Sequence, residues 1–217
     1  MKILDLITHF YNNMILNGST YAQKLTRETQ LLSLITLIGE NISSIPENCL
    51  IVDSTAKIVS LITGCDWNLE DLIAIITFGQ LVLSTKKEYL ASKAAVLSSL
   101  AALAKRDTDL ITKIATPACI HNIMECLKKP VTDIDGSEAA FRNALDCMAS
   151  IVVTEDENII LHVLQAGFLR RAHDILNCGT SNDKRQALWA ISNITASSTH
   201  VKEVIEIANG TLIERVM

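Results

Sequence analysis

Thiols and imidazoles are the side chains of this sequence that could bind a metal ion or, as paired thiols, form disulfides. The cysteines are Cys49, Cys65, Cys119, Cys126, Cys147 and Cys178, and the histidines are His9, His121, His162, His173 and His200. No two cysteines have the CxxC spacing of structural metal sites, and most lie in apolar or helical stretches. His121 and Cys126 have no further ligand nearby. We therefore expect reduced, buried thiols of an intracellular protein, with no metal site and no cofactor.

Catalytic chemistry would need nucleophiles, bases or phosphate-binding loops in recognisable arrangements. The sequence contains no P-loop, no GxGxxG and no GxSxG, and its Ser, His and Asp residues form no nucleophile elbow. We therefore expect no catalytic residues and do not expect an enzyme.

The charge balance limits the classes of partner. The net charge is −5 and the isoelectric point about 5.5, whereas binding to a phosphate backbone is driven by Lys and Arg. The longest uncharged apolar run, residues 72–85, is too short to span a bilayer. The first ten residues lack the small-residue cleavage site of a signal peptide. We expect neither a nucleic acid nor a membrane as partner.

The elements that position the side chains are predicted to be helices. Of the 217 residues, 49% are apolar but only 4% aromatic, with 8 glycines and 3 prolines. This composition favours an all-α fold over an all-β one, because β folds need more aromatic and turn residues.

Helices in the second half recur with a period. Apolar residues three and four apart predict a long helix over 137–154, two shorter ones over 157–164 and 168–176, and another long one over 184–195. Residues 201–208 and 211–217 repeat the short pair. Gly167 and Gly210 are 43 residues apart, as are Ser150 and Asn193. A repeat of two shorter helices and one longer helix with this period is typical of armadillo-like and HEAT-like solenoids.

Towards the N-terminus the period is less regular. The sequence predicts a long helix over 91–104, followed by shorter helices over 109–114 and 120–127. Another long helix is predicted over 27–42, followed by a short helix from Pro46 and a second over 56–62. An extra apolar helix over 69–83 interrupts the period. Either one repeat carries an inserted helix, or the repeats are wrongly phased in this region.

Both ends are expected to fall within a repeat. Residues 1–12 match the middle helix of a unit, and residues 211–217 stop inside the corresponding helix. We therefore expect a single array over 1–217, irregular around 63–90, that starts and ends mid-repeat. It would contain about four to five repeats, some of them incomplete.

One segment resembles a known family. KRQALWAISNITA, residues 184–196, resembles the third helix of an importin-α repeat, and ENIILHVLQAGFLRRAHDIL, residues 157–176, resembles the first and second helices. VKEVIEIANGTLIERVM matches the next such pair. The resemblance is good over 137–217, plausible over 88–136 and faint before that. It implies a right-handed superhelical solenoid of armadillo repeats, in the cytoplasm and nucleus.

The resemblance also assigns roles to side chains. Importin-α binds extended, lysine-rich nuclear localisation signals along its concave surface, where each good repeat presents a Trp and an Asn four residues apart. Trp189 and Asn193 have this spacing, and Ser192 fits the motif between them. The Asn amide would hold the peptide backbone, and the indole would stack on a lysine stem.

Other positions depart from the family pattern. Gln186 stands where an acidic residue is frequent. In the preceding repeat Asp146 and Ser150 take the Trp and Asn positions, and in the one before that Leu97 and Ala101 take them. Near the N-terminus Asn41 is present, but Leu37 replaces the Trp.

Two functions are therefore compared. The first is a protein-binding solenoid that holds an extended segment of its partner on the concave face, with a lysine-rich nuclear localisation signal as the implied ligand. The candidate residues are Trp189, Asn193, Ser192, Gln186, Asp146 and Ser150. The alternative is a non-transport armadillo scaffold, or a structural subunit of a large multi-subunit assembly, which the missing Trp/Asn pairs favour. The acidic turn at 154–157 is predicted to begin a helix, with a contact to a basic peptide as the minor alternative.

Overall fold

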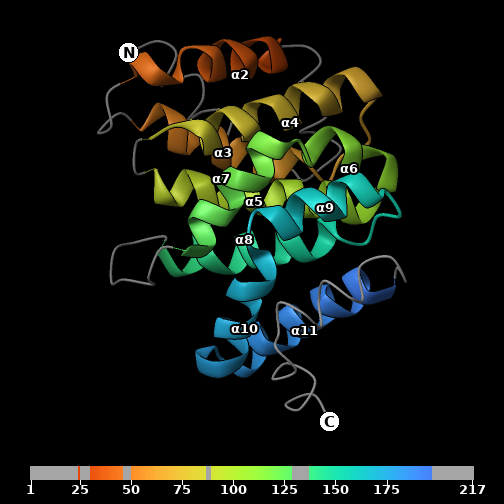
Figure 1. Ribbon diagram of the computed structural model, residues 1–217. Coiled ribbons are helices and arrows are strands. Elements are labelled where there is room, and N and C mark those ends of the chain that lie inside the picture. The colour runs from red at the N-terminus through yellow and green to blue at the C-terminus, as the bar shows by residue number, and fades with distance from the viewer. Residues whose placement is uncertain (1–23, 25–29, 46–49, 87–88, 129–136, 197–217) are drawn as a thin grey trace.

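A computed structural model describes residues 24, 30–45, 50–86, 89–128 and 137–196 (Figure 1). These residues form α-helices, one short 3₁₀ helix and no strand, which confirms the predicted all-α class. The helices are α2 (Leu31–Glu40), η1 (Ile42–Ser44, 3₁₀), α3 (Ile51–Ile62), α4 (Leu69–Ser84), α5 (Leu90–Arg106), α6 (Thr108–Ile114), α7 (Pro117–Lys128), α8 (Ser137–Ile151), α9 (Glu157–Gln165), α10 (Phe168–Cys178) and α11 (Ser181–Ala196). Within the described residues, no helix is long and apolar enough to cross a membrane.

The helices stack in two rows that run through the molecule. The second-helix row contains α2, α4, α7 and α10, and the third-helix row contains α3, α5, α8 and α11. Each helix packs on its neighbour in the row. The chain passes along this stack from α2 at one end to α11 at the other (Figure 1). The short helices α6 and α9 precede α7 and α10, so that α6–α8 and α9–α11 are the two three-helix units predicted from the period.

Of the two alternatives for the N-terminal half, the structure supports wrongly phased repeats and not an inserted helix. Helix α4 is not an insertion, because it lies in the same row as α7 and pairs with α5 as a two-helix unit. Helix α2, predicted as a long third helix, lies in the second-helix row, and α3, predicted as a second helix, packs on α5 in the third-helix row. The helices predicted at Pro46, 1–12, 201–208 and 211–217 lie outside the described residues.

A continuous apolar core holds the two rows together. Its largest fully buried side chains include Phe78 on α4 and Phe168 on α10. Burying an aliphatic or aromatic side chain of this size contributes roughly 1.5–3 kcal/mol. Gly79 allows α4 and α5 to approach closely, since a Cβ there would lie 3.3 Å from Leu100 Cδ2. Burial of the inward faces leaves the outward faces of the third-helix row available to solvent.

Polar side chains fix the helix ends and join successive units. Asn68 and Asp156 cap α4 and α9 by accepting hydrogen bonds from the backbone amides of Asp71 and Asn158. Gly167, with φ of 87°, forms the predicted break before α10. From α4, the Gln80 amide donates to the carbonyl oxygens of Lys113 at 2.9 Å and Ile114 at 3.2 Å, and so caps α6 of the next unit.

The described cysteines form no disulfide bond. Cys65, Cys119, Cys126 and Cys147 are buried, and Cys178 is exposed. Burial, with a smaller contribution from Cys126, raises the pKa of the Cys119 thiol to about 12. Burial also raises the pKa of Cys147 well above its ordinary value. Both thiols are therefore neutral at physiological pH. The described residues contain no group of three or more His, Cys, Asp or Glu side chains that could hold a metal ion.

Candidate functional site

Helix α11 presents the predicted Trp and Asn on its outward face. Its inward face buries Ala187, Ala190, Ile191 and Ile194. The helix begins with a reciprocal cap, in which the Thr180 amide donates to Asp183 Oδ2 at 3.0 Å and the Asp183 amide donates to Thr180 Oγ1 at 3.3 Å. This anchored N-terminus and the buried face fix the rotation of α11 about its axis.

The indole of Trp189 lies at the surface, with 41% of the residue exposed. Asn193 follows one helical turn later and so shares a face with Trp189. The Asn193 amide nitrogen Nδ2 is buried and has no acceptor in the structure. An unpaired buried donor costs on the order of 1–3 kcal/mol. Ser192, the third residue of the motif, is exposed.

Asn193 lines a cavity of about 420 Å³ between the C-terminal ends of α8 and α11. The other residues that line it are Val152, Val153, Thr154, Glu155, Ile160 and Ala196. The C-terminal end of a helix carries a partial negative charge, and the end of α8 lies here beside Glu155. The cavity therefore favours a cation. It also offers the Asn193 amide as a hydrogen-bond donor.

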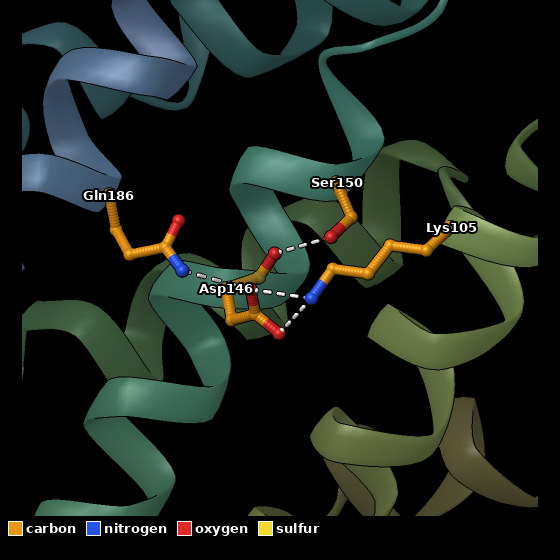
Figure 2. Close-up of polar contacts among 4 residues, drawn as sticks. All are labelled: Lys105, Asp146, Ser150 and Gln186. Atoms are coloured by element: carbon orange, nitrogen blue, oxygen red, sulfur yellow. Dashed lines mark hydrogen bonds and ion pairs between the residues drawn. The ribbon is translucent and has the colours of Figure 1, made fainter.

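Asp146 is the centre of a polar cluster that joins three helices of the row (Figure 2). Lys105 Nζ, from α5, donates to Asp146 Oδ1 at 2.8 Å and Oδ2 at 2.6 Å. Gln186 Nε2, from α11, donates to Oδ1 at 3.3 Å. The Ser150 hydroxyl turns back along α8 and donates to the Asp146 carbonyl oxygen at 2.7 Å.

The structure thus divides the predicted site residues into two groups. Gln186, Asp146 and Ser150 are bonded within the Asp146 cluster, and Ser150 is buried. Trp189 and Asn193 share the outward face of α11 beside the cavity. The two groups are linked through α11, because Gln186 stands one turn before Trp189 on the same helix.

Two predicted positions are wrong. Leu97 and Ala101 are buried in the core, whereas their successors Ser98 and Ala102 are exposed. Asn41 ends α2, in the second-helix row, and its amide donates to the Leu37 carbonyl oxygen at 2.8 Å. Asn41 and Leu37 therefore do not extend the row of α11.

Two residues near the site were not among the predicted candidates, Lys105 and Glu155. The role of Lys105 could not be predicted from a local pattern, because its partner Asp146 lies 41 residues away in sequence. The acidic turn gave a signal for Glu155, and the structure puts this residue in the cavity that Asn193 lines.

No model of a protein family and no curated protein sequence matches the chain. Among solved structures it is similar to the designed armadillo repeat protein YIII(Dq.V1)4CPAF, whose structure is a complex with the peptide (KR)4. The TM-score is 0.70 at 19% sequence identity, and the match covers 96% of this chain and 80% of the designed one. The fold of the chain is therefore that of an armadillo-repeat solenoid.

Proposed function

We propose that the chain binds an extended segment of a partner protein on the outward face of α11, between Trp189 and the cavity beside Asn193. The buried, unpaired amide of Asn193 carries this proposal. A main-chain carbonyl of a bound segment is an acceptor that would satisfy it. The terminal torsion of an Asn side chain is soft, so a small rotation turns Nδ2 towards the cavity that Asn193 already lines.

The chemistry of the cavity favours a basic residue in the bound segment. Glu155 and the C-terminal end of α8 supply negative charge, and the exposed Trp189 ring attracts a cation and packs against its aliphatic stem. The designed armadillo neighbour bound to (KR)4 and the resemblance to importin-α support the same class of ligand. A lysine-rich nuclear localisation signal is the natural segment of this class.

A second function, a scaffold within a larger assembly, is favoured by the middle of the row. Asp146 is occupied by Lys105, and α5 presents Ser98 and Ala102, which have neither a ring nor an amide. A groove with one Trp/Asn pair would bind a peptide weakly, because each such contact is worth only about 0.5–2 kcal/mol. A scaffold would instead use larger surfaces of the solenoid.

Fluorescence anisotropy with a labelled (KR)4 peptide tests the first function. We expect Trp189→Ala and Asn193→Ala each to weaken binding roughly tenfold. Leu188→Ala is the matched control, because Leu188 is exposed on the same helix but points about 100° away from Trp189. It should leave the affinity unchanged.

Three results would count against the proposal. Equal binding of an acidic peptide of the same length would exclude the basic class. Equal affinities of the two variants and wild type would show that the peptide does not bind at α11. No binding by the folded chain at about 1 mM peptide would refute the peptide site and leave the scaffold.

A further inference from the structure

The side chain of Lys105 places an ammonium group of the protein itself on the Asp146 carboxylate. Both carboxylate oxygens accept from Nζ, at 2.8 and 2.6 Å, and Oδ1 also accepts from Gln186 (Figure 2). The contact is open to solvent, since the side chains of Lys105 and Asp146 are 47% and 28% exposed. A bound segment could therefore reach Asp146, but it would find the carboxylate already paired.

Asp146 holds the position in α8 that Trp189 holds in α11, 43 residues later. Neighbouring helices are about 8–10 Å apart and an extended chain advances about 3.3 Å per residue, so a segment crossing the row meets the next helix after about three residues. A second basic residue at that spacing would lie over Asp146. There it would have to displace Lys105, whose ammonium also repels it.

We propose that Lys105 determines specificity at the peptide site, because it allows only one basic residue of the bound segment to increase the affinity. This inference rests on the proposed function. The cavity beside Asn193 binds one basic side chain. The Lys105–Asp146 pair prevents a second basic side chain from adding to the affinity. Ser98 and Ala102 on α5 offer no further contact of the ring or amide type. One Lys or Arg thus gives a segment the affinity that the site can offer, and further lysines in a run add little to it.

The test compares peptides that differ by one lysine. One peptide has a single Lys in an otherwise uncharged Gly/Ser/Gln sequence. Two others carry a second Lys three residues before or after the first. For wild type, we expect all three affinities to agree within about twofold. For Lys105→Met, one two-lysine peptide should bind about three- to fivefold more tightly than the one-lysine peptide, as expected for a partly exposed ion pair.

Two control variants separate this effect from a general change of charge. The double variant Lys105→Met/Asp146→Asn has the wild-type net charge but no carboxylate, and should return the ratio of affinities to about one. Lys57→Met removes an exposed charge from α3, in the same row, and should not change the ratio.

The outcomes distinguish this inference from the proposed function. Wild-type binding with no change of ratio in Lys105→Met overturns the inference and leaves the peptide site. Binding by Lys105→Met but not by wild type overturns both, because Lys105 would then block the site instead of setting its specificity. No binding by either protein overturns both.

Discussion

The Arg171 guanidinium on α10 donates a hydrogen bond of 2.7 Å from Nε to the carbonyl oxygen of Leu127, in the last turn of α7. Its Cζ lies 5.7 Å from the centroid of the Phe141 ring on α8, and Nη1 lies 3.7 Å from Asp174 Oδ2. One side chain thus joins two consecutive repeats and donates to a carbonyl in the last turn of a helix, where carbonyls need partners from outside the helix.

Arg171→Met should lower the free energy of unfolding by about 1–3 kcal/mol, because it removes a charged hydrogen bond and a cation–π contact. Urea denaturation measures the change. Arg170→Met is the matched control, since Arg170 is exposed on the same helix, and should change the free energy by less than about 0.5 kcal/mol. Equal effects of the two variants would contradict the joining role of Arg171.

Gly167→Ala should destabilise the chain by about 1–2 kcal/mol, because φ of 87° at this position is unfavourable for a residue with a Cβ. Space is not the cause, since a Cβ at Gly167 would meet nothing within 4 Å. Gly64→Ala provides the comparison, because its Cβ also meets nothing within 4 Å and its φ lies outside the left-handed region. In thermal melts Gly64→Ala should be neutral or stabilising, and a comparable loss in both variants would rule out backbone strain at Gly167.

Asn193→Leu should stabilise the free protein, or leave its stability unchanged, while it weakens peptide binding. The substitution removes a buried donor that has no acceptor, and an apolar side chain of similar size avoids the desolvation cost of about 1–3 kcal/mol. Differential scanning fluorimetry with and without peptide reports both effects. A clear loss of stability without peptide would show that the amide is already satisfied.

Stability should fall as the pH rises from about 9 towards 12. The Cys119 thiol has an ordinary pKa of 9.0, which burial raises to about 12 in the folded chain. Between these values the unfolded state binds fewer protons than the folded state, so the unfolding free energy decreases by up to about 1.4 kcal/mol per pH unit for this thiol. Below pH 9 the effect is absent.

Urea midpoints measured under reducing conditions between pH 8 and 11 check this prediction. Cys119→Ala should reduce the slope, whereas alanine at the exposed Cys178 should leave it unchanged. An unchanged slope in Cys119→Ala would assign the loss of stability to other groups.

The repeats that could be predicted from sequence are those with a short first helix and a clear break between helices. Gly167 and the short helices before it identify the units α6–α8 and α9–α11. The sequence predicts α5 as a long helix of a repeat, but α4 has no short helix before it in its own unit, so α4 could not be recognised as the second helix of that repeat. The phase there is set by the packing of α4 on α2 and α7, which a linear pattern does not contain.

The candidate site was predictable only where side chains differ strongly between faces. On α11, Trp189 and Asn193 contrast with the buried alanines, and the motif gives the correct face. On α5, Ala and Ser occur on both the inner and the outer face. The predicted exposed face, which contains Leu97, therefore differs by about 100° from the observed one, which contains Ser98. The Lys105–Asp146 pair depends on the stacking of α5 on α8, which no local spacing encodes.

The packing of each helix against its immediate neighbours has a consequence for local opening. Among the described helices, α5 has α3, α4, α6 and α8 as its main packing partners, whereas α11 packs mainly on α8 and α10. In a linear array, segments with fewer interfaces open at lower free energy, so the amide protons of α11 should exchange with solvent faster than those of α5. A segment bound across Trp189 would slow this exchange, and the binding site would then be visible as newly acquired protection in the least protected helix of the pair.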